Sequence, residues 1–275
     1  MTTSISESEL LSRLLPLKGT FNVRDVGGYR TTDGRQVKWK TLLRGDALHG
    51  LDDEGRVHLA SYGLQSSIDL REDDERAAAP DRFDGEVRSI SVPLFSLGAS
   101  TLMGETLDRT NLTTLEDVYR LLVHTRGEAL VAAIRELADP ANVPAIVHCS
   151  AGKDRTGVVI ALVLAVLGVP DDVIAADFAA TSLFLNEDFR LALLTRSEAL
   201  RRDSTVVERM LSCEPDLILG ILAEIRIEYG DIAVYLVQHG LELEELRSLR
   251  TVLLSHPGAV GVPADHRTIE GSTDE

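Results

Sequence analysis

Short apolar segments alternate with longer amphipathic segments along the first two thirds of the chain. The short segments have the continuous or alternating apolar character of strands, and the longer ones carry apolar residues at helical spacing. Because strands and helices alternate, we expect an α/β fold with a central, mostly parallel sheet flanked by helices. The predicted strands are residues 36–39, 41–44, 65–70, 87–94 and 144–147, and the predicted helices of this part are residues 51–62, 115–125, 128–137 and 158–169.

The last third of the chain has helical periodicity alone. We expect this helical part to pack near the carboxyl edge of the sheet, where ligands bind in such folds. The predicted helices begin at Pro170, occur twice within residues 187–219, and continue over residues 220–229, 231–239 and 242–254. The pattern divides the chain into an N-terminal arm (residues 1–18), one domain (19–255) that contains a loop at 96–114, and a disordered tail (256–275).

Composition narrows the class of protein. The hydrophobic content of 44% and charged content of 26% are typical of a globular chain. A net charge of −16 disfavours binding to nucleic acid or anionic lipid. The longest apolar run, residues 158–169, is too short to span a bilayer, and the N-terminus has no secretion signal. We therefore predict a cytoplasmic protein without stable membrane insertion; secretion by another route and the oligomeric state stay open.

One polar stretch joins the strand at 144–147 to the helix at 158–169. It reads His148-Cys149-Ser150-Ala151-Gly152-Lys153-Asp154-Arg155-Thr156-Gly157. A loop in this position turns backbone N–H groups toward one point, and the following helix adds its positive N-terminal end. A cysteine at the head of the loop sits where a thiolate is stabilised, and Arg155 can bind two phosphate oxygens at once. The stretch predicts cysteine-dependent hydrolysis of phosphate esters.

The alternative interpretation is an ordinary strand–helix turn with a buried cysteine. It gives no reason for Lys153, Asp154 and Arg155 to stand together beside Cys149. The chain has two cysteines, and the long separation of Cys149 from Cys213 fits neither a disulfide framework nor a local zinc site. We interpret Cys213 as an ordinary buried thiol rather than a second catalytic or resolving cysteine.

Together with four further segments, this stretch resembles the bacterial protein tyrosine and phosphoinositide phosphatases of the mycobacterial phosphatase B type. The resemblance covers roughly residues 19–254. The segments are Asn-Val-Arg-Asp-Val-Gly-Gly at 22–28, Leu-Arg-Gly-Asp at 43–46, Ile-Asp-Leu-Arg at 68–71, and the C-terminal Glu-Tyr-Gly at 228–230 with Arg-Thr-Val-Leu-Leu at 250–254.

The resemblance implies a role for each residue of the loop. Cys149 attacks phosphorus and forms a phosphocysteine, Arg155 holds the equatorial oxygens, and Thr156 donates its hydroxyl to the departing sulfur. The remaining phosphate-binding positions are Ser150, Ala151, Gly152, Lys153 and Gly157. No metal or other cofactor is implied, and the expected substrate is a phosphotyrosyl protein or a phosphoinositide, with dual specificity as an option.

The general acid is the one departure from this pattern. The family carries an aspartate shortly after the strand at 87–94, whereas Ser96 stands there in this chain. A serine hydroxyl is too weak an acid to protonate the leaving phenolate. The alternatives are Asp154 in the loop and Asp108 in the segment 96–114; we favour Asp154, because its place in the loop puts it near the phosphate.

Other residues of the motifs have less specific interpretations. His148 is expected to order the loop by hydrogen bonding rather than to act as a base. Asp69 and Arg71 are expected to be structural. An ion pair between Arg24 and Asp25 and a contact of these residues with substrate are equally consistent with the pattern, and the roles of Arg44 and Asp46 stay open. The resemblance also suggests a helical lid over residues 184–216.

Two functions of other classes compete with the phosphatase. One is a catalytically impaired phosphate-binding module, which the missing aspartate favours and the intact Cys149, Arg155 and Thr156 oppose. The other is sulfur transfer of the rhodanese kind, against which Asp154 and the long helical C-terminal part argue. Turnover of p-nitrophenyl phosphate without metal separates the phosphatase from both.

Overall fold

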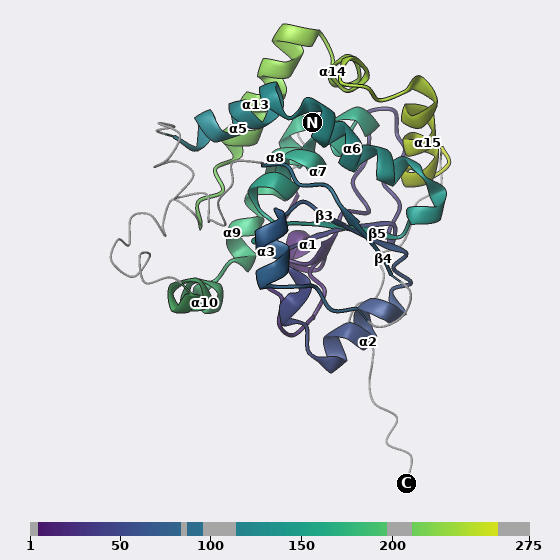
Figure 1. Cartoon of the computed structure of the whole chain (residues 1–275). Coiled ribbons are helices and arrows are strands. Elements are labelled where there is room, and N and C mark those ends of the chain that lie inside the picture. Colours follow the sequence, from purple (N-terminus) through teal and green to yellow (C-terminus); the bar gives the residue numbers. More distant parts are fainter. Residues whose placement is uncertain (1–4, 84–86, 96–113, 197–210, 258–275) are drawn as a thin grey trace.

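The protein is built around a five-stranded sheet in the order β1-β2-β5-β3-β4 (Figure 1). The structure is a computed structural model, and it describes residues 5–83, 87–95, 114–196 and 211–257. The strand β1 pairs antiparallel with β2, and the other neighbours are parallel, which confirms the mostly parallel sheet. The strands are β1 (Arg24–Asp25), β2 (Leu42–Gly45), β3 (Ser66–Asp69), β4 (Arg88–Ser91) and β5 (Ala145–His148).

The central strand β5 brings three strand ends together. His148, its last residue, lies opposite Gly45 of β2 on one side and Asp69 of β3 on the other. Because all three strands run parallel, their carboxyl ends meet at one edge of the sheet, directly before Cys149. The register therefore places the polar residues that follow β2 and β3 around the active loop.

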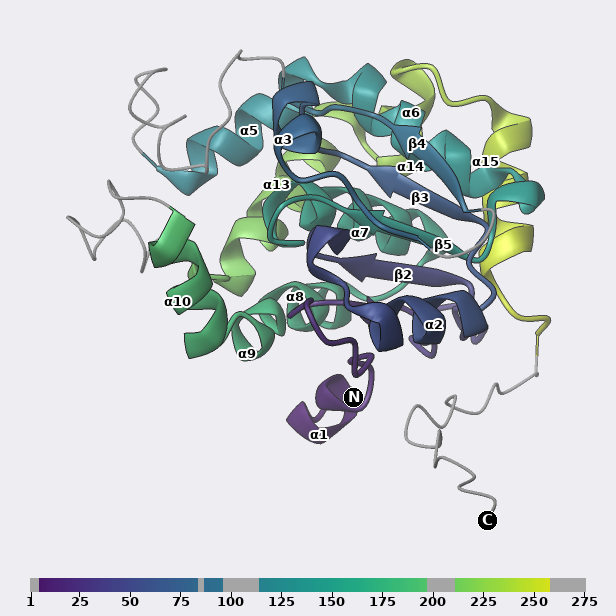
Figure 2. The ribbon, with the colours of Figure 1, turned by 60° about the horizontal axis from the view of Figure 1, so that its bottom comes forward.

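Helices lie on both sides of the sheet, as expected. In β2 and β5, Leu42 and Val147 face a large core under most of the helices, whereas Leu43 and Ile146 face a smaller core. This smaller core includes Leu59 of the helix α2, which lies across β2 in Figure 2. The longer helices are α2 (Asp53–Ser61), α5 (Leu115–Thr125), α6 (Gly127–Ala138), α7 (Asp154–Leu167), α8 (Asp171–Ala179), α10 (Glu187–Arg196), α13 (Pro215–Tyr229) and α15 (Leu243–Leu253).

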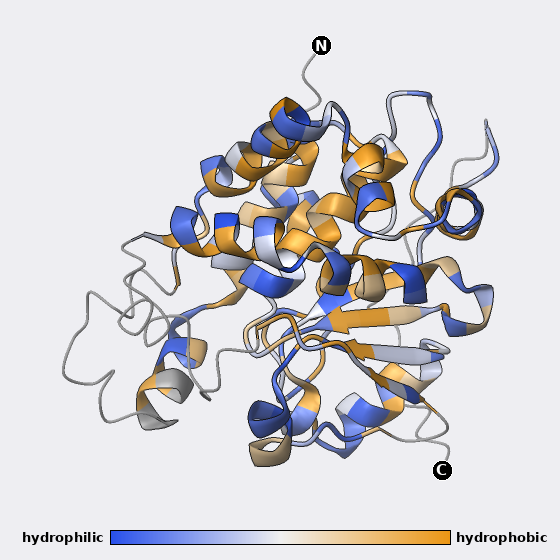
Figure 3. Cartoon of the chain, turned by 45° about the horizontal axis from the view of Figure 1, so that its top comes forward, coloured by the Kyte–Doolittle hydropathy of each residue, from blue (hydrophilic) through white to orange (hydrophobic). Residues whose placement is uncertain are grey.

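Shorter helical pieces complete the described chain. They are α1 (Glu7–Leu11), α3 (Asp73–Ala78), α9 (Thr181–Phe184), α14 (Ile232–Gln238) and the 3-10 turns Leu48–Gly50 and Pro140–Asn142. Figure 3 shows the apolar residues concentrated on the helices stacked over the sheet and on its inner strands. Of the described residues, those in helices include no stretch both long and apolar enough to cross a bilayer.

The helix α7 is the buried centre of the large core. Nearly all of its side chains are buried, and it ends at Gly168, whose φ of +89° is the left-handed conformation that suits a glycine at a helix end. The helix begins at Asp154 rather than at the predicted residue 158. Apolar periodicity could not detect this first turn, because the turn is made of the polar residues of the active loop.

The structure corrects several element boundaries. Residues 36–39 form no extended strand: Gln36 and Val37 make isolated bridges to Arg30 and Leu254, because the chain there passes between a turn and the end of α15. The expected helix start at residue 220 is wrong, since α13 runs without a break through Gly220. An apolar stripe that includes Leu217, Ile221 and Ile225 spans that glycine.

The helix α3 was not expected from the sequence. Its six residues include four charged ones and none that is buried, so it carries no apolar periodicity. The strand β4 is shorter than predicted and largely exposed.

Some expectations concern residues outside the described ranges. These are most of the loop at 96–114, part of the lid at 184–216, and residues 258–275 of the tail. The division into arm, domain and tail stays a prediction. Within the arm, Arg13 is fully buried, with its guanidinium 3.9 Å from the ring centroid of Tyr29 and 4.7 Å from that of Trp39.

Candidate active site

The active loop begins where β5 ends and finishes inside the first turn of α7. Cys149 follows His148 directly and is 3% exposed. Asp154, Arg155, Thr156 and Gly157 form the first turn of α7. The structure thus brings all the predicted loop residues between the carboxyl end of the central strand and the N-terminus of the most buried helix.

Glycine is required at two positions of the loop. Gly152 has a φ of +67°, and a Cβ built on it would lie 2.4 Å from the carbonyl carbon and oxygen of Gly45. A Cβ on Gly157 would lie 2.9 Å from the ring of Phe178 in α8. Both contacts let the loop pack directly on β2 and α8.

Two side chains from distant segments set the direction of the loop peptides. The Asn22 amide donates to the carbonyl oxygens of Ala151 and Gly152, at 3.0 and 3.2 Å. A guanidinium nitrogen of Arg44 donates to the same Gly152 oxygen at 2.9 Å. Since the N–H of a trans peptide points opposite its C=O, the amides of Gly152 and Lys153 are turned the other way. These contacts create the convergent amides of an anion site.

Arg155 is held by a carboxylate that sequence reasoning missed. Its two terminal nitrogens donate to the two oxygens of Glu75 in α3, at 2.6 and 2.9 Å, and one of them lies 3.2 Å from the Ser150 hydroxyl. Ser150 also donates to Glu75. Burial acts to raise the pKa of Glu75, but the hydrogen bonds and charge of Arg155 outweigh it and lower that pKa to about 2. The pair fixes the plane of the guanidinium.

Asp154 and Lys153 point toward the helical layer. The Tyr119 hydroxyl of α5 donates to Asp154 Oδ1 at 2.7 Å, and Lys153 Nζ lies 3.4 Å from the same oxygen. Lys153 also donates to the carbonyl oxygen of Ser212 at 3.0 Å. Burial first, and then the negative charge of Asp154, raise the pKa of Tyr119. The role of Asp154 as acid stays a prediction.

Thr156 is fully buried, and its hydroxyl oxygen has no hydrogen-bond partner in the part of the chain that the structure describes. The hydroxyl is therefore available to a group that forms at the sulfur of Cys149. Cys213 is also buried, near the charges of Lys153 and Asp154, and burial raises the pKa of its thiol to about 11. Ser96 and Asp108 lie outside the described residues.

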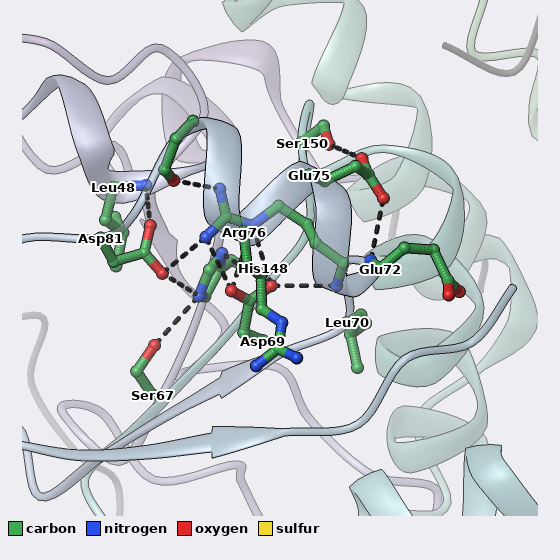
Figure 4. A network of polar contacts seen from close by, with 12 residues as sticks. Leu48, Ser67, Asp69, Leu70, Glu72, Glu75, Arg76, Asp81, His148 and Ser150 are labelled. Atoms are coloured by element: carbon green, nitrogen blue, oxygen red, sulfur yellow. Dashed lines mark hydrogen bonds and ion pairs between the residues drawn. The ribbon is translucent and has the colours of Figure 1, made fainter. Parts of the chain in front are cut away.

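His148 belongs to a network of buried charges beneath the loop (Figure 4). Its Nε2 lies 3.0 Å from the Ser67 hydroxyl and 3.2 Å from Asp81 Oδ2. Burial acts to raise the pKa of Asp81, but its contacts with His148 and the charge of Arg71 lower it. The network supports the expected ordering role of His148.

The same network contains the one group of described residues with the spacing of metal ligands: Asp69, Asp81 and His148. The Arg71 guanidinium donates to Asp69 Oδ2 at 2.7 Å and lies 2.9 Å from Asp81 Oδ2. Arg71 already supplies the positive charge that a cation would bring, and these donors fit an ion-pair network rather than a metal. The expected structural role of Asp69 and Arg71 agrees with these contacts.

A second buried network lies on the other side of the loop. Arg24 and Arg44 both pair with Asp177 of α8, at 3.4 and 2.5 Å, and the Tyr29 hydroxyl donates to the same carboxylate at 3.0 Å. Burial acts to raise the pKa of Asp177, and the two arginines lower it to about 2.

The two aspartates of the N-terminal motifs bind backbone. Asp25 accepts from the amides of Gly27 and Lys40, at 2.7 and 2.8 Å. Asp46, whose role the sequence left open, accepts from the amides of Phe21 and Asn22. Burial raises the pKa of Asp46 to about 6, against the lowering effect of those amides.

Comparison with known proteins identifies the family. The sequence model of the tyrosine phosphatase family matches residues 15–255. The chain belongs to this tyrosine phosphatase family. The expected family and enzyme class are therefore confirmed.

Relatives of this tyrosine phosphatase include the triple specificity protein phosphatase PtpB of Mycobacterium tuberculosis, 29% identical over 86% of this chain and 98% of that protein. A tyrosine-protein phosphatase of Nostoc commune is 32% identical over 52% of this chain and 49% of that protein. The crystal structure of P. aeruginosa TpbA covers 68% of this chain and 89% of that one, with 18% identity and a TM-score of 0.31, too low to support an argument about the fold.

Proposed function

We propose that this phosphatase hydrolyses phosphotyrosyl proteins through a phosphocysteine on Cys149. The observation that carries the proposal is the loop itself, in which Asn22 and Arg44 turn two carbonyls away and Glu75 holds Arg155 beside the amides. Donors arranged in this way before substrate arrives are suited to the charge that develops on a transferring phosphoryl group.

The chemistry has two steps. The Cys149 thiolate attacks phosphorus, a sulfur–phosphorus bond forms, and the phosphorus–oxygen bond to the leaving group breaks while an acid protonates that oxygen. Water then attacks the phosphocysteine, releasing inorganic phosphate and the thiolate. Arg155 has five N–H donors, so hydrogens remain for phosphate oxygens beside the two that bind Glu75. The unpartnered hydroxyl of Thr156 supports its role as donor to the departing sulfur.

The remaining loop positions have proposed roles in binding phosphate. The amides from Ser150 to Asp154 supply donors, and Gly157 allows close packing of the first turn of α7. For the general acid, the sequence favours Asp154, and a different carboxyl is argued below. The proposed substrates are phosphotyrosyl proteins, with phosphoserine, phosphothreonine or phosphoinositides as further substrates, since PtpB is named a triple specificity phosphatase.

The test measures turnover of p-nitrophenyl phosphate and a phosphotyrosyl peptide with a chelator present. We expect activity in the wild type and a loss of at least about three orders of magnitude in Cys149→Ser, since removal of a nucleophile has effects of this size. Cys213→Ser is the matched control and should retain activity. Turnover by Cys149→Ser above about one per cent of wild type would contradict the nucleophile.

Two further measurements decide between the alternatives. A wild-type protein that binds vanadate but turns over no aryl phosphate would support the phosphate-binding module. A panel of phosphotyrosyl, phosphoseryl and phosphatidylinositol phosphate substrates on the same preparation would define the substrate class.

A further inference from the structure

Glu72 is a second carboxyl group at the edge of the active site. It is the N-cap of α3, and it forms a capping box with Glu75, whose Oε2 accepts a hydrogen bond from the Glu72 amide at 3.0 Å. Figure 4 shows both side chains on this short segment. Since Glu75 binds Arg155, the capping box also fixes the segment that carries Glu72 beside the catalytic arginine.

One oxygen of the Glu72 carboxyl is covered but unpaired. The backbone amide of Phe95, at the end of the segment that follows β4, donates to this carboxyl group. Glu72 Oε1 is buried, and it has no hydrogen-bond partner among the residues described. A covered carboxylate oxygen without a donor is unfavourable, whereas a protonated oxygen can itself donate. The environment therefore favours a carboxyl that carries a proton until a suitable acceptor arrives.

The charged groups around Glu72 come from three elements. Burial raises its pKa above the ordinary glutamate value, and the negative charge of Glu75 acts in the same direction. The Phe95 amide and the positive charges of Arg155 in α7 and Arg126 before α6 oppose this effect without cancelling it. The pKa of Glu75, three residues later, is lowered to about 2. Two neighbouring carboxyls with pKa values moved in opposite directions are typical of an acid beside a permanently ionised group.

We propose that Glu72 is the general acid of this phosphatase. The inference rests on the proposed function. As the phosphorus–oxygen bond breaks, the proton on Glu72 moves to the leaving oxygen, and Glu72 becomes a carboxylate. That carboxylate then takes a proton from the water that attacks the phosphocysteine, which restores the acid form for the next turnover.

The contacts favour Glu72 over Asp154. Asp154 Oδ1 is approached by two donors, the Tyr119 hydroxyl and the Lys153 ammonium group, and both lie on the side of the helical layer. Such an oxygen is placed to accept rather than to donate. Glu72 has one oxygen free of donors and stands on the side of Arg155 and Glu75, where the guanidinium meets the substrate.

The experiment compares Glu72→Gln with wild type on substrates that differ in leaving group. Glutamine retains an oxygen to accept the Phe95 amide, but it has no proton to give. We expect kcat/KM to fall about a hundredfold for phenyl phosphate and less than about tenfold for p-nitrophenyl phosphate, whose leaving group needs little protonation. The alkaline decline of kcat/KM with phenyl phosphate should also disappear in this variant.

Two controls separate the acid from a structural effect. Asp73→Asn removes a carboxyl from the next residue, whose side chain is 88% exposed and pairs with Arg76, and it should leave both substrates unaffected. Glu72→Asp keeps an ionisable carboxyl; it should retain the alkaline decline and part of the activity. It keeps the proposal testable if Glu72→Gln folds poorly.

An equal loss on both substrates, or no loss on phenyl phosphate, would overturn the role of Glu72. A leaving-group-dependent loss in Asp154→Asn with none in Glu72→Gln would assign the acid to Asp154. Failure of the proposed function has another signature: wild type would not turn over p-nitrophenyl phosphate, or Cys149→Ser would retain its activity.

Discussion

Arg155 and Glu75 form the contact on which the geometry of the phosphate site depends most directly. A guanidinium on a long flexible side chain has many rotamers, and ordering it has an entropic cost for each bound substrate. The bidentate pair with Glu75, at 2.6 and 2.9 Å, orders the fork before substrate binds. Burial acts to lower the pKa of Arg155, but the hydrogen bonds of Glu75 and the charge of Cys149 raise it, so the positive charge is permanent.

Glu75→Gln should lower activity without changing the dependence on the leaving group. An amide presents one acceptor instead of two charged oxygens, so Arg155 loses its fixed plane. We expect kcat/KM to fall about ten- to a hundredfold on both phenyl and p-nitrophenyl phosphate, as for other small misplacements of a binding group. Glu187→Gln, which removes an exposed carboxylate paired with Arg190, is the control and should have no effect. A loss confined to phenyl phosphate would contradict this role.

The same pair makes a contribution to stability that depends on pH. The pKa of Glu75 is about 2 in the folded state against an ordinary 4.5, so the ionised pair stabilises the fold fully above about pH 4.5. This contribution is lost as the pH falls from 4.5 toward 2. Urea unfolding of wild type and Glu75→Gln should give a constant difference in unfolding free energy between pH 7 and 5, and a shrinking one below pH 4.5. A difference at pH 3 as large as at pH 7 would be inconsistent with the pair.

Among the elements, the contact between the active loop and β2 determines how tightly the loop can turn. Gly152 lies against the backbone of Gly45, the last residue of β2, and no side chain fits between them. The antiparallel strand β1 starts next to Asn22, whose amide reaches the same part of the loop. The loop is thus shaped by the edge of the sheet as well as by α7.

Gly152→Ala should destabilise both the fold and the binding of phosphate. A left-handed backbone costs an alanine roughly 1–2 kcal/mol, and the overlap with Gly45 should add about 1–3 kcal/mol. Gly34→Ala is the matched control, because Gly34 has a φ of +83° but nothing within 4 Å of the added methyl. We expect Gly152→Ala alone to weaken vanadate binding, measured by titration, and to lose more unfolding free energy. Equal losses in the two variants would mean that the loop tolerates the methyl group.

At the scale of the whole molecule, Asp177 connects parts of the chain that are far apart in sequence. Its carboxylate pairs with Arg24 of β1 and Arg44 of β2 from its place in α8. Arg44 reaches on to the active loop, and Arg24 also donates to the Thr181 hydroxyl at 3.0 Å. This network joins the antiparallel edge of the sheet to the helical layer through the site.

Asp177→Asn should be among the most destabilising single changes. It leaves two buried guanidinium groups with reduced compensation, and breaking a buried pair in this way costs about 3–5 kcal/mol. Asp171→Asn, in the same helix, removes an exposed pair with Arg226 and should cost at most about 1 kcal/mol. Chemical denaturation measures both. A loss below about 1 kcal/mol for Asp177→Asn would show that the network contributes little to stability.

The order of strands and most helices could be predicted because their signals are local. The helix at residues 115–125 has the predicted bounds, and the strands at 41–44, 65–70 and 144–147 differ by one or two residues at each end. The errors occur where local signals are weak or misleading: α3 has no apolar face, and Gly220 is an isolated helix breaker within a longer apolar stripe. In both cases, contacts with distant parts of the chain determine the element.

The sequence by itself determined the active loop, because its residues are consecutive and its flanking strand and helix are predicted by their own apolar character. The tertiary structure decided the partners of the loop. Glu75 and Glu72 reach it from α3, whereas Asn22 and Arg44 reach it from the N-terminal motifs, across about 75 to 130 positions in sequence. Their arrival depends on β2 and β3 pairing on either side of β5, which brings the ends of three parallel strands to one point. No local pattern contains that pairing, because its energy comes from contacts that exist after the sheet has formed.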